Sequence, residues 1–226
     1  MVNVLLESYN LTEPFLIDAL KPHIRPHHHV AIVAFSFLPS QATTLQQWLS
    51  LYGREEGMFY HWLVDPLMEF GIPEENISVV NYFSDSKETA RNKIQNADIL
   101  YFTGGLPDAM MDRLAEFELL DVLATFDGLV LGCSAGAMIQ LQEYHITPDW
   151  DYPEFGYYQG LPWLKDFCVE VHYEETDLQK DSIRRVLCER GKPVYATFRD
   201  CGALLIKNGQ ITQLGKTELF LPGKDM

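Results

Sequence analysis

A serine flanked by glycines lies near the middle of the chain, in Gly132-Cys-Ser-Ala-Gly136. The apolar residues 129–131 before it predict a short buried strand, and residues 137–141 after it predict a helix. A G-x-S-x-G motif between a strand and a helix is typical of a nucleophile elbow, whose strained turn leaves no room for side chains at the two glycines. We therefore expect Ser134 to lie at the carboxyl edge of a sheet, close to free N–H groups that can bind an oxyanion.

Two other interpretations of this segment remain open. It could be a glycine-rich turn with an incidental serine. Alternatively, Cys133 could be the nucleophile, as in glutamine amidotransferases of related architecture. An elbow centred on Cys133 would place Leu131 and Ala135 where glycines are needed, so the register favours Ser134.

A serine nucleophile needs a general base, and the base needs an acceptor that fixes its tautomer. Of the seven histidines, His23 and residues 27–29 precede a predicted strand, which is the wrong edge of a parallel sheet. We interpret residues 27–29 as a solvated loop and expect no metal site. His172 ends a predicted strand and is followed by polar residues, so we expect it to be the base.

The elements that would position these residues alternate between strand and helix. This order predicts an α/β fold, a three-layer sandwich with a mostly parallel central sheet and helices on both faces. A β-hairpin that turns at Asn208-Gly209 is expected near the carboxyl end. An aromatic and acidic segment, residues 145–158, is predicted to be a loop that walls the site. The predicted strands cover residues 2–7, 30–35, 77–83, 98–102, 129–131, 167–172 and 194–198.

Composition narrows the class of protein. The 226 residues are 47% hydrophobic, so we expect one domain, residues 1–226, with a substantial core. A formal charge of −15 disfavours nucleic acid as a partner. The four scattered cysteines indicate free thiols in a reducing cytoplasm. Neither a secretion signal nor a membrane span is recognisable, so no membrane partner is expected.

The sequence resembles peptidase E, the aspartyl dipeptidase, and its relative cyanophycinase, which have a class I glutamine amidotransferase-like fold. The resemblance rests on the elbow at residues 132–137, the glycine turn at Phe102-Thr-Gly-Gly105, the strand-end His172 and the Asn-Gly-Gln turn at residues 208–210. It extends over nearly the full chain in order and spacing, and its most specific part is Ser-Ala-Gly-Ala at residues 134–137.

The resemblance implies roles for individual residues. Ser134 would be the nucleophile, His172 the base, and the N–H groups of Gly105 and Ala135 the oxyanion hole. For the acid it offers two candidates, Asp200 as the partner of His172 and Asp149 as a second residue of the site. Asp151 would replace Asp149 if that loop is shifted, and chain order does not decide between these acids.

The same comparison suggests residues that contact substrate, namely Gly104, Leu106, Trp150 and Gln179. Two of them depart from peptidase E. Leu106 and Pro107 stand where that family has Asn-Thr, and proline donates no N–H. Gln179 stands where that family has an arginine that meets a substrate's aspartyl carboxylate.

The resemblance therefore implies a serine peptidase that hydrolyses dipeptides or short peptides through a Ser-His-Asp triad and an acyl-enzyme. It requires no cofactor, and its partner would be a small peptide or amide substrate; a homodimer is also considered. Two alternatives remain, an esterase or amidase with the same triad and a non-catalytic, amidotransferase-like protein that binds a small ligand.

Overall fold

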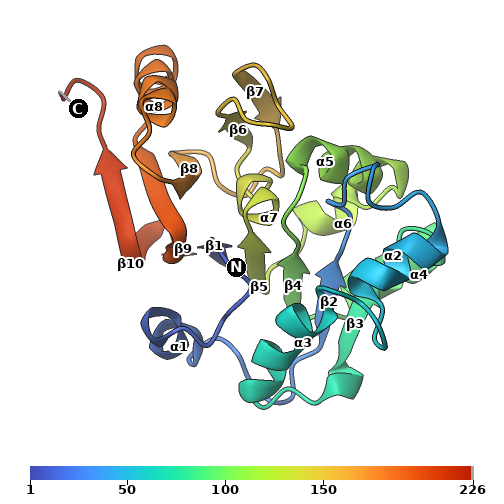
Figure 1. Cartoon of the computed structure of the whole chain (residues 1–226). Helices are drawn as coiled ribbons and strands as arrows, with labels where there is room; N and C mark the ends of the chain where they lie inside the picture. Colours follow the sequence, from blue (N-terminus) through green and yellow to red (C-terminus); the bar gives the residue numbers. More distant parts are fainter. Residues whose placement is uncertain (225–226) are drawn as a thin grey trace.

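One mixed sheet of eight strands forms the centre of the computed structural model, which describes residues 1–224. The strands are β1 (Val2–Leu6), β2 (Val30–Val33), β3 (Ile77–Val80), β4 (Ile99–Phe102), β5 (Leu129–Cys133), β8 (Cys168–Tyr173), β9 (Val194–Lys207) and β10 (Gln210–Phe220). Their order is β10-β9-β1-β5-β4-β2-β3, and β8 also pairs with β9 (Figure 1). Strands β1 to β5 are mutually parallel, and β9 runs antiparallel to β1 and to β10.

Helices cover both faces of this sheet. They are α1 (Pro14–Leu20), α2 (Leu45–Tyr52), α3 (Tyr60–Glu69), α4 (Lys87–Gln95), α5 (Pro107–Glu116), α6 (Leu120–Ala124), α7 (Ala135–Met138) and α8 (Asp177–Arg190), with a short 3-10 turn at Glu74–Asn76. Helices α1 to α3 contribute to one buried apolar cluster and α4 to α7 to the other. Helix α8 packs on β8, β9 and β10 in a third, smaller cluster.

Successive side chains of a strand point to opposite faces of the sheet, so each strand contributes to both of the two larger clusters. In β4, Leu100 and Phe102 belong to the cluster with α4 to α7, whereas Ile99 and Tyr101 belong to the cluster with α1 to α3. Both sets are fully buried, as expected for parallel strands covered on both faces. The predicted three-layer α/β sandwich and the C-terminal hairpin, which is β9 and β10, are therefore confirmed.

Two local expectations are corrected. Residues 145–158 are not all loop, because β6 (Glu143–Ile146) pairs with β7 (Gly156–Gln159) and leaves residues 147–155 as the connection. The elbow helix is a single turn that ends at Met138 rather than continuing to residue 141. The carbonyl of Ile139 accepts from Leu161 N–H at 2.7 Å, so the chain leaves the helix to pair with a distant segment.

No helix within residues 1–224 is both long and apolar enough to cross a membrane.

Candidate active site

The turn after β5 holds Ser134 in a strained backbone conformation, with φ 51° and ψ −109°. The neighbouring glycines are required by close packing. A Cβ on Gly132 would lie 2.1 Å from the carbonyl oxygen of Gly136, and a Cβ on Gly136 would lie 2.4 Å from that of Phe102. The strain is maintained because β5, which ends just before Ser134, is held between its neighbours β1 and β4. Ser134 is thereby presented at the carboxyl edge of the sheet, half-buried.

His172 reaches Ser134 because strand β8 contains a bulge. Glu170 pairs with Ala196 of β9 and Tyr173 with Phe198, so β8 has one residue more than its partner between these points. His172 lies in this irregular stretch with a φ of 53°, and a bulge of this kind re-aims a side chain. Its Nε2 lies 2.7 Å from Ser134 Oγ, which is hydrogen-bond distance for proton transfer.

The carboxylate at the other ring nitrogen belongs to Glu7. Its Oε2 lies 2.6 Å from His172 Nδ1 and accepts a hydrogen bond from the His172 backbone N–H at 2.9 Å. Its Oε1 accepts a hydrogen bond from the Thr197 hydroxyl. The Nδ1–H does not meet the geometry of a hydrogen bond to Oε2, so this contact is a close ion pair, and catalytic hydrogen bonds are often poorly aligned before substrate binds. The Glu7 side chain is 1% exposed.

Glu7 lies here because β1 and β5 are neighbours in register. Leu6 is opposite Cys133, so the next residue of each strand, Glu7 and Ser134, emerge side by side at the same edge. Thr197 of β9 donates its hydroxyl to the same carboxylate. Sequence reasoning missed Glu7, although it is the last residue of a predicted strand, because the sequence does not show which strand pairs with that one.

The carboxylate in contact with His172 is not one of the acids expected from the sequence. Within residues 1–224, neither Asp200 nor Asp149 hydrogen-bonds or ion-pairs with His172. Asp200 is exposed, with a φ of 59°, in the irregular stretch between the two halves of β9. Asp149 Oδ1 accepts from its own loop, from the N–H groups of Asp151 at 2.9 Å and Tyr152 at 2.8 Å. Asp151 is exposed in the same loop.

The backbone N–H groups of Gly105 and Ala135 have no hydrogen-bond partner within the described residues. The adjacent amides are occupied. Gly104 N–H donates to the hydroxyl of Tyr9 at 2.7 Å, and Leu106 N–H donates to the carbonyl of Ser36 at 2.8 Å. Gly105 and Ala135 therefore have N–H groups available for an oxyanion, while the amides of Gly104 and Leu106 hold the turn.

The rival nucleophile, Cys133, points into the core between the sheet and helices α1 to α3. Its side chain is 5% exposed and belongs to the apolar cluster with α1 to α3. Burial, followed by the charges of Glu7 and Asp200, raises the pKa of the thiol well above its ordinary value. A thiol held protonated in the core is a poor nucleophile.

A cavity of about 460 Å³ opens at Ser134 and His172. Its walls include Gly105, the 147–155 loop and the start of α8, and Trp150 lines it while remaining fully exposed at 103%. Gln179 also lines it, but both ends of its amide are used. Its Nε2 donates to the His172 carbonyl at 2.9 Å, and its Oε1 accepts from the Glu174 N–H at 2.9 Å. Gln179 therefore holds the turn after β8.

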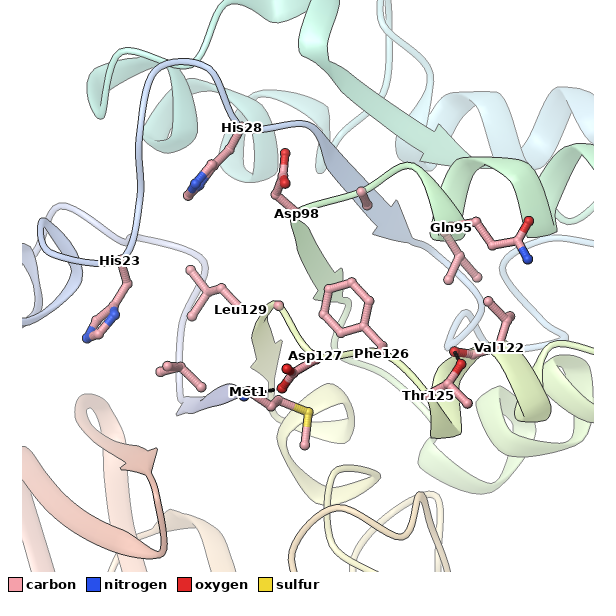
Figure 2. A pocket seen from close by; sticks show the side chains of 14 residues that line it. Met1, His23, His28, Gln95, Asp98, Val122, Thr125, Phe126, Asp127 and Leu129 are labelled. Carbon is pink, nitrogen blue, oxygen red and sulfur yellow. Dashed lines mark hydrogen bonds and ion pairs between the residues drawn. The ribbon is translucent and has the colours of Figure 1, made fainter.

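A second cavity, of about 610 Å³, lies at the opposite edge, where β1, β4 and β5 begin (Figure 2). His23, His28, Asp98 and Asp127 surround it, and burial is the main cause that lowers the pKa of both histidines. The cavity is larger than the one at Ser134, but it is lined by neither Ser134 nor His172. The chemistry is therefore assigned to the smaller cavity at the carboxyl edge.

These features define a serine-type hydrolase: an α/β sheet, a strained elbow that carries Ser134, a histidine in contact with that serine, and free amides beside it. The sequence pattern of peptidase family S51 matches residues 65–214. The chain belongs to this family, which is the peptidase E family, and is a serine peptidase.

Two solved structures share the fold. A protein from Listeria monocytogenes EGD-e that carries a provisional peptidase E name is 18% identical, with a TM-score of 0.64 over 95% of this chain and 98% of that one. A peptidase from an acI-B1 Actinobacterium is 14% identical, with a TM-score of 0.57 over 99% of this chain and 95% of that one. No curated protein sequence matches the chain significantly.

Proposed function

We propose that this serine peptidase hydrolyses dipeptides or short peptides through a Ser134–His172–Glu7 triad. The observation that supports it best is the line of contacts from Ser134 Oγ to His172 Nε2 at 2.7 Å and from His172 Nδ1 to Glu7 Oε2 at 2.6 Å. A nucleophile, a base and a buried carboxylate in this order constitute a catalytic triad irrespective of chain order.

In the first step His172 Nε2 takes the proton of Ser134 while Oγ attacks the peptide carbonyl carbon. Glu7 stabilises the imidazolium, and the N–H groups of Gly105 and Ala135 bind the oxyanion, each contributing about 3 kcal/mol. His172 then gives the proton to the leaving amine, which departs and leaves an acyl-enzyme on Oγ. A water molecule, deprotonated by His172, hydrolyses that ester and regenerates Ser134.

The cavity size supports a short substrate. About 460 Å³ is within the range of small-molecule sites, and the 147–155 loop and the start of α8 form part of its walls. A reducing, cytoplasmic location is also proposed, supported by four free cysteines, and cell fractionation would test it.

The test is labelling by a fluorophosphonate, followed by intact-mass measurement. One adduct is expected on the native protein and none on Ser134→Ala or His172→Ala, because the reagent needs an activated serine. Labelled protein is then compared with unlabelled protein for hydrolysis of dipeptides and of matched esters. If the folded native protein acquires no adduct, the proposed triad is wrong. If only esters are cleaved, the activity is that of an esterase rather than of a peptidase.

A further inference from the structure

A buried acid lies in the wall of the cavity beside Ser134 and has no part in the triad. Glu170 on β8 is 4% exposed and lines the cavity together with His145 and Thr147. Its Oε2 accepts two hydrogen bonds, from His145 Nε2 at 2.8 Å and from the Thr147 hydroxyl at 2.8 Å. These two contacts fix the orientation of the carboxylate.

The second oxygen, Oε1, is left without a partner. It accepts no hydrogen bond within residues 1–224, and it is not among the enclosed polar atoms that lack one. Oε1 therefore keeps some exposure, on a side chain that lines the cavity. A buried carboxylate with one oxygen fixed and the other open is a ready acceptor for a charged N–H donor.

His145 does not present its own positive charge to the cavity. Its side chain is 1% exposed, its Nε2 is bonded to Glu170, and its Nδ1 is enclosed. Burial alone would lower the pKa of His145, but Cys168 and Glu170 raise it to about 9. The imidazolium of His145 therefore stabilises the Glu170 carboxylate through Oε2, and the atom left for a ligand is Oε1.

The cavity offers little to a substrate's carboxylate. Arg199 is the arginine that lines it, and its Nε lies 2.5 Å from Glu174 Oε1. Gln179 uses both ends of its amide on the backbone of His172 and Glu174. Asp149 adds another acid at the rim, and the whole chain carries a formal charge of −15. These charges attract cations and repel anions.

We infer that the cavity beside Ser134 selects substrates by a positively charged nitrogen, which Glu170 Oε1 binds. This inference rests on the proposed hydrolase function of the same site. The nitrogen is either the free α-amine of a peptide or the amine of a basic side chain, and both present the same N–H donors to the carboxylate.

The experiment measures binding to Ser134→Ala, which cannot turn over its ligand. Calorimetry compares norleucine amide, which has an α-amine, N-acetyl-lysine amide, which has a side-chain amine, and N-acetyl-norleucine amide, which has neither. At least one amine probe is expected to bind about tenfold tighter than the neutral one, and which probe does so identifies the source of the nitrogen. Equal affinities, or tighter binding of N-acetyl-glutamate amide, overturn the inference.

Variants assign the selectivity to one residue. Glu170→Gln in the Ser134→Ala background should reduce the preference to less than about twofold, while Glu174→Gln, at an exposed acid of the same cavity, should keep it. The reverse result overturns the assignment. A readout without substitution at Glu170 is the ¹⁵N resonance of His145 Nε2, which should shift when an amine probe binds and stay constant with the neutral one.

The two proposals fail separately. Fluorophosphonate labelling and hydrolysis without any preference for amines would leave the hydrolase and remove the Glu170 site. Amine selectivity that depends on Glu170, in a protein whose serine is never labelled, would leave the binding site and remove the triad.

Discussion

Glu7 contributes a carboxylate from the first strand to a site whose other members come from the middle of the chain. Both of its oxygens are bonded, Oε2 to His172 and Oε1 to the Thr197 hydroxyl, so its orientation is fixed before substrate arrives. A carboxylate in this position holds the histidine in the tautomer that accepts the serine proton.

Replacement of Glu7 by glutamine keeps the shape of the side chain and removes the charge. We expect Glu7→Gln to lower kcat by about 10²–10⁴-fold, since the imidazolium loses its stabilising partner. Asp200→Asn and Asp149→Asn are the matched controls, with an expected change of less than about threefold because neither carboxylate contacts His172. Steady-state kcat values on one dipeptide measure these effects. A large loss of kcat in Asp200→Asn, with none in Glu7→Gln, would identify Asp200 as the acid.

Gln179 acts on the reaction through the conformation of His172. Its amide bridges the His172 carbonyl and the Glu174 N–H, and His172 has a left-handed φ of 53°. We expect Gln179→Leu to lower kcat by about tenfold with little change in KM, because the base is held less firmly while the cavity keeps its size. Lys180→Gln, one residue along, should leave both constants unchanged. An increase in KM alone would indicate a direct contact with substrate.

At the scale of elements, the elbow depends on the close approach of α7 to β4. A Cβ on Gly136 would lie 2.4 Å from the Phe102 carbonyl oxygen, which belongs to a fully buried strand and cannot move freely. We expect Gly136→Ala to lower the free energy of unfolding by about 1–3 kcal/mol, measured by urea denaturation. The control is Gly191→Asn, at the left-handed end of α8 with nothing within 4 Å of its Cβ, where about 1 kcal/mol or less is expected. Equal losses would show that the contact at Gly136 relaxes.

At the scale of the whole molecule, the buried His145–Glu170 pair links stability to pH. The pKa of His145 is raised to about 9 in the folded state, above the ordinary value of 6.5. Folding therefore favours protonated His145. The contribution of this group to the free energy of unfolding is complete below about pH 6.5 and is lost as pH rises through about 9. We expect a loss on the order of 3 kcal/mol across this range. Urea denaturation at several pH values measures it.

His145→Gln is the control for that prediction. Glutamine can still donate to Glu170 but does not titrate, so its stability should change less than that of the native protein between about pH 6.5 and pH 9. Parallel curves for the two proteins would mean that other groups cause the loss.

The sequence by itself determined the α/β sheet, the elbow at Ser134 and the strand that contains His172. These features are local, because apolar periodicity defines the strands and the spacing of Gly132 and Gly136 around Ser134 follows from the sterics of one turn. The family resemblance also came from such local motifs in their order.

Only the tertiary structure decided which carboxylate faces His172 and which amides are free. Glu7 and Ser134 are 127 positions apart, and they meet because β1 pairs with β5 in one particular register. The bulge in β8 and the bend in β9 then bring His172 and Thr197 to the same carboxylate. The amides of Gly104 and Leu106 proved occupied for the same reason, since their partners, Tyr9 and Ser36, come from distant segments, which one sequence does not encode in any local pattern.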